Sequence, residues 1–305
     1  TFTSAPDYET KTSYTATVTA SDGTNTTTQN ITVNVTNLND NSPVFTSDTT
    51  FTAAENQTSI GTVAATDGDA SDTVTFTVSG SELAITSAGV LTFTSAPDYE
   101  TKTSYTATVT ASDGTNTTTQ NITVNVTNLN DNSPVFTSGA TFSAAENQTS
   151  IGTVTATDGD ANDTVTFSVS GSELLISSAG VLTFSSAPDY ETKTSYTATV
   201  TASDGTNTTT QNITVNVTNL NDNSPVFTSD TTFTAAENQT SIGTVAATDG
   251  DASDTVTFTV SGSELAITSA GVLTFTSAPD YETKTSYTAT VTASDGTNTT
   301  TQNIT

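Results

Sequence analysis

The sequence predicts an all-β fold made of tandem immunoglobulin-like β-sandwiches, each with seven strands, joined end to end as a rod. Three observations support this prediction. The sequence repeats every 91 residues, apolar and polar residues alternate with a period of two inside each repeat, and Gly-containing turns separate the alternating segments. No apolar period of about 3.6 residues runs long enough to predict a helix.

The repeat is marked by a ten-residue phrase, Thr-Asn-Leu-Asn-Asp-Asn-Ser-Pro-Val-Phe, which occurs at 36–45, 127–136 and 218–227. The spacing between successive copies is 91 residues, the size of one small domain. The intervening sequence repeats as well, and 45–123 and 227–305 are identical. Such similarity favours selection for length over a distinct surface on each domain.

We therefore predict four segments, two of which are complete repeats. Both ends of the chain fall inside a repeat, which favours a window from a longer array; a subunit whose two ends complete one another is the alternative. The segments are the C-terminal part of a repeat at 1–44, complete repeats at 45–135 and 136–226, and a repeat lacking its last strand at 227–305.

Within the first complete repeat, the longest alternating segments predict the last two strands. Residues 103–111 alternate apolar residues with threonines, and residues 121–126 alternate in the same way. Asp113-Gly114 between them is typical of a hairpin turn. Shorter strands are expected at 50–54, 60–66, 73–78, 83–86 and 90–93.

The composition restricts the functional classes. The chain has 32 acidic residues, four lysines and no arginine, which gives a formal charge of −28. A basic surface for nucleic acid or anionic lipid is therefore not expected. Because Cys is absent, we expect no disulfides, thiolate chemistry or Cys-based zinc sites. No apolar run is long enough for a membrane span, so we expect no membrane contact by this segment.

Five short polar signatures follow one another in each full repeat. In the first complete repeat they are Ala54-Glu55-Asn56, Asp67-Gly68-Asp69, Asp98-Tyr99-Glu100, Tyr105 through Asp113-Gly114, and 128–136. In this order they resemble the xEN, DxD, DxE, YxhxVxAxDG and DxNDNxPxF motifs of cadherin repeats, specifically the bacterial-type cadherin-like domains of giant surface proteins. The resemblance covers the whole chain, and five ordered motifs at a fixed period are a specific signal.

The resemblance implies Ca²⁺ as the cofactor, with up to three ions at each junction between successive repeats. For the first junction the implied ligands are Asp7, Glu9, Asn39, Asp40, Asn41, Asp67, Asp69 and Asp113. For the second they are Glu55, Asp98, Glu100, Asn130, Asp131, Asn132, Asp158, Asp160 and Asp204. For the third they are Glu146, Asp189, Glu191, Asn221, Asp222, Asn223, Asp249, Asp251 and Asp295. The last copy carries the corresponding acids Glu237, Asp280 and Glu282.

The residue types themselves also favour calcium, which takes six to eight oxygen ligands from carboxylates, amides and carbonyls. Seven of the ten acids in residues 45–135 fall in the signatures, at predicted strand ends or turns. Such convergence would be repulsive without cations, and three ions at each of three junctions would add about 18 positive charges. The family usually has Asp where this chain has Asn37, Asn128 and Asn219, so fewer than three ions per junction is the alternative.

Other polar residues have simpler expected roles. An EF-hand over 67–72 is rejected because the loop lacks the Gly at its sixth position and the terminal Glu. Asp72 and Glu82 match no signature and are expected on the solvated surface, whereas Tyr99 and Tyr105 are expected to pack in the core or joint. The lysines after each Asp-Tyr-Glu motif, expected to screen it, are Lys11, Lys102, Lys193 and Lys284. Asn-x-Thr sequons, which leave glycosylation open, begin at Asn25, Asn30, Asn34 and Asn56 and their equivalents.

We therefore predict a structural function: a calcium-rigidified extracellular rod, forming a stalk or filament segment of a surface adhesin or extracellular fibre. Its expected location is extracellular or at the cell surface, in a prokaryote. Its expected partners are calcium, neighbouring repeats of the same chain and identical chains in a fibre. The alternative is a direct adhesion module, homophilic or carbohydrate-binding. Enzymatic activity is not expected, since the acids are accounted for as ligands and both His and Cys are absent.

Overall fold

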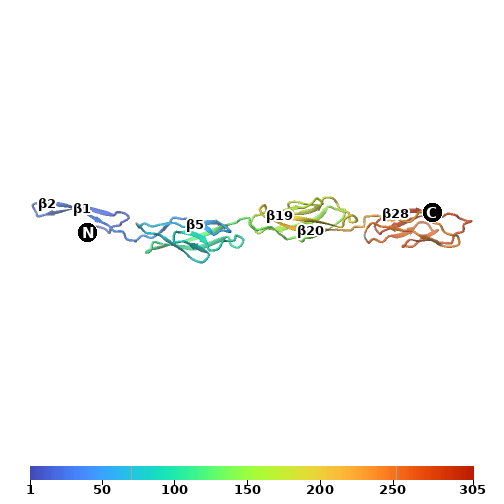
Figure 1. Cartoon of the computed structure of the whole chain (residues 1–305), viewed down its shortest axis with the longest axis horizontal. Helices are drawn as coiled ribbons and strands as arrows, with labels where there is room; N and C mark the ends of the chain where they lie inside the picture. The colour runs from blue at the N-terminus through green and yellow to red at the C-terminus, as the bar shows by residue number, and fades with distance from the viewer. Residues whose placement is uncertain (70, 252) are drawn as a thin grey trace. The chain divides into compact units, whose positions relative to one another are not determined.

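The computed structural model describes residues 1–69, 71–251 and 253–305. All regular elements in these ranges are β-strands (Figure 1), as the sequence predicts. The described residues include no helix long and apolar enough to cross a membrane. The chain divides into two compact units: unit 1 comprises Thr1–Asn132 and Gly159–Asp163, and unit 2 comprises Ser133–Asp158 and Thr164–Thr305.

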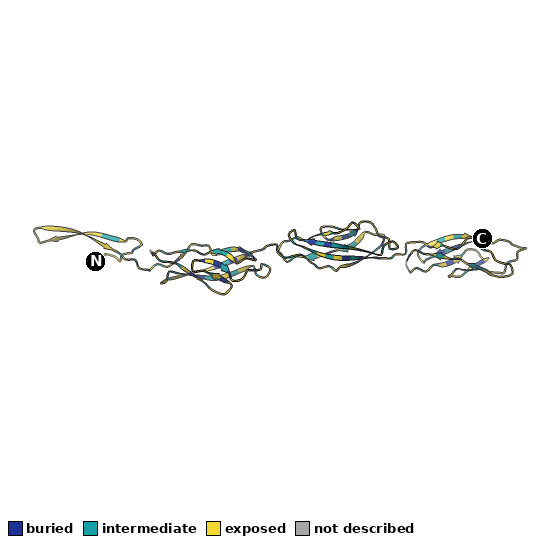
Figure 2. Cartoon of the chain, in the orientation of Figure 1, coloured by how far each residue is buried: buried dark blue, intermediate teal, exposed yellow. Residues whose placement is uncertain are grey.

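Unit 1 begins with a hairpin of two long antiparallel strands, β1 (Ser13–Ser21) and β2 (Thr26–Asn34). Most of this hairpin is exposed (Figure 2). Val18 on β1 is 49% exposed, whereas its equivalent in the next repeat, Val109, is 0% exposed. The same alternating sequence therefore forms a hairpin in both places, and its apolar face is buried only where a second sheet covers it.

The next repeat in unit 1 is a sandwich of two sheets. Its strands are β3 (Val44–Phe45), β4 (Thr50–Ala54), β5 (Ser59–Thr62), β6 (Ala65–Thr66), β7 (Thr75–Val78), β8 (Leu83–Ile85), β9 (Val90–Phe93), β10 (Ser104–Ser112) and β11 (Thr117–Thr127). One sheet has the order β4-β11-β10-β7 and the other has the order β5-β9-β8, while β3 pairs with β6. The β4–β11 pair is parallel and the other pairs are antiparallel.

The nine strands occupy seven strand positions in the described residues, because a short loop interrupts two of the positions. The β3 and β4 segments form the first strand, interrupted by a loop, and β5 and β6 form the second. The predicted strand at 60–66 is therefore divided. Its first part pairs with β9 and its second part pairs with β3, which belongs to the linker phrase.

The core of this repeat lies between the two sheets. Leu91 from the three-stranded sheet packs in one cluster with Val109 and Val124 from the four-stranded sheet, and all three side chains are fully buried. Burying each such side chain contributes about 1.5–3 kcal/mol. Because successive strand residues face opposite sides, the threonines that alternate with them, such as Thr106, lie on the outer face. The predicted packing of Tyr99 and Tyr105 against this core is confirmed.

Unit 2 contains the second sandwich and the last copy. The strands of the second sandwich are β12 (Val135–Phe136), β13 (Thr141–Ala145), β14 (Ser150–Thr153), β15 (Ala156–Thr157), β16 (Thr166–Val169), β17 (Leu174–Ile176), β18 (Val181–Phe184), β19 (Ser195–Ser203) and β20 (Thr208–Thr218). The strands of the last copy are β21 (Val226–Phe227), β22 (Ser241–Thr244), β23 (Ala247–Thr248), β24 (Thr257–Val260), β25 (Leu265–Ile267), β26 (Val272–Phe275), β27 (Ala289–Ser294) and β28 (Thr299–Ile304). The sheet orders are β13-β20-β19-β16 with β14-β18-β17, then β24-β27-β28 with β22-β26-β25.

One glycine in the turn before β18 is required by both backbone conformation and space. Gly180 has φ +86°, and a Cβ atom there would lie 2.1 Å from the carbonyl oxygen of Val154. Gly171 has a similar φ of +83°, with nothing within 4 Å of its Cβ position. Substituting each glycine in turn therefore distinguishes two costs: that of a side chain on a left-handed backbone, which applies to both, and that of a clash with the neighbouring backbone, which applies to Gly180 alone.

Gly180→Ala should destabilise its sandwich by about 1–3 kcal/mol more than Gly171→Ala, because only the first change forces backbone movement. Denaturant unfolding of the two variants measures this difference. Equal losses in the two variants would show that the close approach to Val154 costs nothing.

Candidate metal centres

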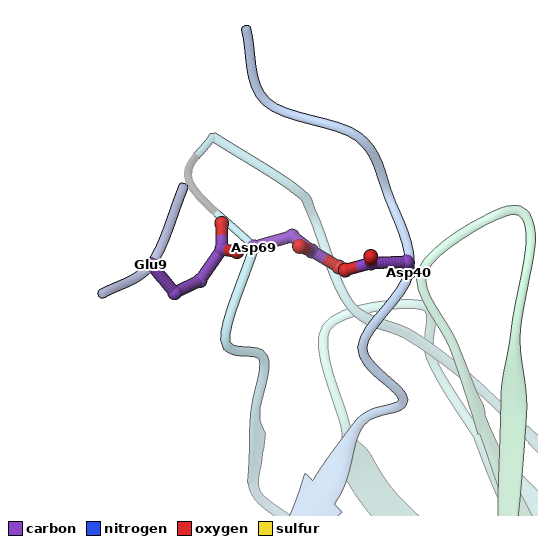
Figure 3. Close-up of side chains that lie close together, drawn as sticks. All are labelled: Glu9, Asp40 and Asp69. Atoms are coloured by element: carbon purple, nitrogen blue, oxygen red, sulfur yellow. The ribbon is translucent and has the colours of Figure 1, made fainter. Parts of the chain in front are cut away.

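Three acids from different segments of unit 1 converge in the first acidic group. Glu9 lies before β1, Asp40 in the linker phrase and Asp69 in the loop after β6, and each offers a carboxylate oxygen within 4.8 Å of the others. Figure 3 shows the three side chains pointing toward one another. The sequence predicted all three as ligands of one junction, and the structure brings them together.

Backbone and amide hydrogen bonds fix the position of Asp69. The Asn41 N–H donates to Asp69 Oδ2 at 2.8 Å, and Asn41 Nδ2 donates to Asp69 Oδ1 at 2.9 Å. Asp69 N–H in turn donates to Asp67 Oδ1 at 2.8 Å. A Cβ atom on Gly68 would lie 3.1 Å from Asn41 Cγ, so glycine lets the loop close tightly on the linker. This clamp couples the Asp67-Gly68-Asp69 loop to the phrase that carries Asp40.

An asparagine that no signature identified completes the connection to the hairpin. Asn116 Nδ2 donates to Asn39 Oδ1 at 2.9 Å and to the Asn41 carbonyl at 2.7 Å. The Asn116 N–H also donates to Asp113 Oδ1 at 2.6 Å. Its fixed place, three residues after the Asp113 of the hairpin turn in every copy, is the signal that could have found it.

A buried glutamate organises the second group, which also belongs to unit 1. Glu55 is 2% exposed and accepts two backbone hydrogen bonds at 2.7 Å, from Tyr99 N–H and Leu129 N–H. Its carboxylate forms a group with Asp98 and Glu100. Both oxygens of Glu55 are thereby held in place, and the strand ends that carry the other acids are tied to it.

The opposite side of the second group is built by the next linker phrase. Glu100, Asp131 and Asp160 each offer an oxygen within 4.8 Å of the others. Asn132 repeats the clamp, with its N–H at 2.8 Å and its Nδ2 at 3.0 Å from the Asp160 carboxylate. Asn56 Nδ2 donates to Asp131 Oδ2. The other residues predicted for this junction are Asn130, which lies in unit 1, and Asp158 and Asp204, which lie in unit 2.

The third group, in unit 2, repeats this construction. Glu146 is 2% exposed, accepts from Tyr190 N–H and Leu220 N–H at 2.7 Å, and groups with Glu191 and Asp222. The other predicted residues make equivalent bonds. Asn223 donates to Asp251 at 2.8 and 2.9 Å, Asp251 N–H donates to Asp249 at 2.9 Å, Asn298 Nδ2 donates to Asn221 Oδ1 at 2.8 Å, Asn298 N–H donates to Asp295 at 2.6 Å, and Thr192 Oγ1 donates to Asp189 at 3.0 Å.

The corresponding acids of the last copy are not brought into a comparable setting. Glu237, Asp280 and Glu282 are all exposed. Glu237 accepts one backbone bond, from Tyr281 N–H at 3.1 Å. Its surrounding sequence is identical to that of Glu55, so the burial of Glu55 depends on residues beyond the identical stretch, in particular Leu129.

The donor atoms fit a hard divalent cation. The Oδ2 atoms of Asp67 and Asp113 are buried and accept no hydrogen bond from the described residues, and the same holds for Asp249 and Asp295. A buried carboxylate oxygen without a donor is costly, and a cation would satisfy it. The neighbouring groups are carboxylates and amides, the oxygen ligands that calcium prefers.

Two expectations for residues outside the signatures need correction. Lys102 Nζ pairs with the exposed Glu82 at 2.5 Å and lies 4.3 Å from the centre of the Tyr105 ring, so its ion pair is not with the Asp-Tyr-Glu motif it was expected to screen. Asp72 is half-buried and not fully solvated, because its Oδ2 atom is buried although the residue keeps part of its surface exposed.

In a chelator, lowering the pH from neutral toward 4.5 should stabilise the chain. Burial raises the pKa of Glu9, Glu100 and Glu191 above 4.5, and neighbouring acids add to the effect. The folded state then binds protons more tightly than the unfolded state, so this contribution is complete below pH 4.5 and is lost as the pH rises through the raised pKa.

Below pH 3.8 the trend should reverse. Hydrogen bonds from the Thr10 and Thr283 hydroxyls lower the pKa of Asp7 and Asp280 below 3.8, so their contribution is present above that pH and is lost as the pH falls. The melting temperature, measured in chelator between neutral pH and pH 3, tests both the rise in stability and its reversal. A melting temperature that falls steadily from neutral pH would contradict the raised glutamate pKa values.

The fold and these acidic groups define a class of protein: tandem β-sandwich repeats with carboxylate clusters where successive repeats meet inside a unit. No family model matches the chain. The chain is 34% identical over 138 residues to the human cadherin EGF LAG seven-pass G-type receptor 1, covering 40% of this chain. It spans 5% of the length of that relative.

Solved structures agree with that comparison over nearly the full chain. The protocadherin gammaB4 extracellular domain is 28% identical with a TM-score of 0.71, covering 99% of this chain and 55% of that one. The protocadherin gammaB7 EC3-6 cis-dimer structure is 24% identical with a TM-score of 0.77, covering 99% of this chain and 86% of that one. In sequence and in fold, the chain is therefore similar to tandem cadherin repeats.

Proposed function

We propose that this chain is a calcium-rigidified extracellular rod, a stalk or filament segment of a surface adhesin or extracellular fibre. The observation that carries the proposal is the convergence of Glu9, Asp40 and Asp69, acids from two successive repeats, within 4.8 Å. The formal charge of −28 makes such convergence unfavourable unless cations bind. Extracellular modules of this kind bind calcium at about 10⁻⁴–10⁻³ M, which suits a location outside the cell.

Bound calcium would supply the positive charge that links the carboxylates of one repeat to those of the next. The chain's own residues prepare the sites for it. Backbone donors hold both oxygens of Glu55 and Glu146, so these ligands need little reorganisation. The clamp between Asn41 and Asp69 fixes the linker to the loop of the following repeat. Each joint would then resist bending only when its carboxylates are bridged.

Small-angle X-ray scattering in calcium and in chelator tests this proposal. In calcium, the maximum dimension and stiffness should correspond to an extended rod, and in chelator they should become those of folded sandwiches on flexible linkers. Circular dichroism on the same samples checks that the strands persist. An unchanged maximum dimension and stiffness after calcium removal would contradict a calcium-rigidified rod.

Direct adhesion, homophilic or to carbohydrate, is the second candidate. Its support is the protocadherin gammaB7 relative, which is described as a cis-dimer. Light scattering of the calcium-bound chain tests homophilic association, and a glycan array tests carbohydrate binding. A monomer that binds no glycan would leave the structural rod as the function.

A further inference from the structure

The side-chain amide of Asn116 connects two residues of the linker phrase that the sequence predicted as ligands. Its Nδ2 atom donates to Asn39 Oδ1 at 2.9 Å and to the Asn41 carbonyl at 2.7 Å, and both bonds are partly buried. Asn116 itself lies outside the five signatures. One neutral nitrogen atom therefore bridges two oxygens that a cation could also bridge.

The last copy, in unit 2, builds the same bridge from the equivalent residues. Asn298 Nδ2 donates to Asn221 Oδ1 and to the Asn223 carbonyl, both at 2.8 Å. The bridge therefore occurs in two separate units, each time between a hairpin turn and the linker phrase that precedes its repeat.

The amide satisfies the neutral oxygens of the linker but not every carboxylate oxygen in the same turn. The Asn116 N–H donates to Asp113 Oδ1 at 2.6 Å, whereas Asp113 Oδ2 is buried and accepts no hydrogen bond from the described residues. The last copy repeats this difference, with Asn298 N–H at 2.6 Å from Asp295 Oδ1 and a buried Asp295 Oδ2 without a donor in the described ranges. An asparagine amide has two N–H donors and no charge, so it replaces only part of what a divalent cation would supply.

The hairpin turn does not need this side chain in order to form. In the hairpin of β1 and β2, the exposed Asn25 makes the same backbone bond, from its N–H to Asp22 Oδ1 at 2.7 Å. An alanine at position 116 would keep the backbone N–H and therefore the bond to Asp113. The side chain of Asn116 can thus be removed without removing the bond that shapes the turn.

We propose that the side-chain amides of Asn116 and Asn298 hold the linker to the following repeat in place of a cation, and that a cation must displace them to bridge the same oxygens. Calcium binds oxygen at 2.3–2.6 Å, so a bridging ion would take nearly the place of the amide nitrogen. The inference rests on the proposed calcium-binding function and gives one ion at each of these two junctions an intramolecular competitor. In chelator, the amide keeps the linker on the following repeat, whereas Glu9 of the preceding repeat is not held by it.

The test compares two pairs of Asn→Ala changes in the full chain. The first variant carries N116A and N298A. The control carries N125A and N216A, which make the same chemical change at exposed asparagines of β11 and β20. In chelator, the altered repeats of the first variant should melt about 4–8 °C below those of the parent, because each loses two hydrogen bonds to the linker. The control should melt with the parent.

Calcium binding should change in the opposite direction. Titration calorimetry should show one ion at each of the two altered junctions binding about tenfold more tightly than in the parent, because no amide has to be displaced. Lower stability in chelator together with weaker calcium binding would show that the amides only support the fold, and would overturn the proposal. Unchanged melting in chelator would overturn it as well. A parent chain that binds no calcium would instead overturn the proposed function, and the melting in chelator would still show whether the amides hold the linker.

Discussion

Calcium at about 10 mM should raise the free energy of unfolding by about 4–8 kcal/mol for each junction, relative to the chain in chelator. Each ion that binds the folded state with a Kd of about 10⁻⁴–10⁻³ M contributes about 1.4–2.7 kcal/mol at this concentration, and the total is for three ions per junction, the largest number that the resemblance implies. Scanning calorimetry across a calcium series measures the effect, because the melting temperature should rise with the logarithm of the calcium concentration.

Magnesium at the same concentration is the control for calcium. It requires a smaller, near-octahedral site and gives up its water reluctantly, so it should stabilise the chain much less. Equal melting temperatures in calcium and chelator would contradict calcium binding at these groups. Equal shifts with the two cations would indicate only screening of the acidic charge.

Glu146→Ala should destabilise the second sandwich by about 2–4 kcal/mol in chelator, where calcium makes no contribution. Two partly buried backbone N–H groups, of Tyr190 and Leu220, lose a charged acceptor, and each such bond is worth about 1.5–3 kcal/mol. Relief of repulsion from Glu191 and Asp222 offsets part of the loss. Denaturant unfolding in chelator measures the change without interference from metal binding.

Glu237→Ala is the matched control for Glu146→Ala. Glu237 occupies the equivalent position in the last copy, is exposed and accepts one bond of 3.1 Å from Tyr281. Its removal should therefore cost less than about 1 kcal/mol. Similar losses in the two variants would show that the second backbone bond and the burial of Glu146 contribute nothing.

The sequence predicts the fold well where a strand of four or more residues alternates apolar and polar residues. The strands expected at 50–54 and 90–93 match β4 and β9, and the alternation in 103–111 corresponds to β10, because one apolar face on a strand has a single way to be buried. The two-residue strand β3 could not be found this way. Its partner β6 is equally short, so neither carries an alternating pattern, and their pairing is fixed by the fold around them.

The residues of the candidate site could likewise be predicted from the sequence only in part. Acids with a motif, such as Glu9 and Asp40, could be placed together from sequence because five signatures recur at a fixed spacing. Asn116 could not, because its role depends on a loop conformation that brings its side chain back to Asn39 in a distant segment. The burial of Glu55 and its two backbone hydrogen bonds are likewise a property of the folded strand ends, and the exposed Glu237 in an identical sequence demonstrates it.

The near-identity of the cores has a consequence for how the chain folds. Of the described residues, none of the nine that differ between the repeats beginning at 45 and 136 lies in the buried clusters, and Leu175, the largest change, is 52% exposed. Side chains therefore cannot tell a strand which sandwich it belongs to, since Val109 would pack as well in its neighbour's core as in its own. Correct assembly must come from connectivity and from the order in which repeats leave the ribosome, and rapid refolding of the whole chain should produce strand exchange between repeats.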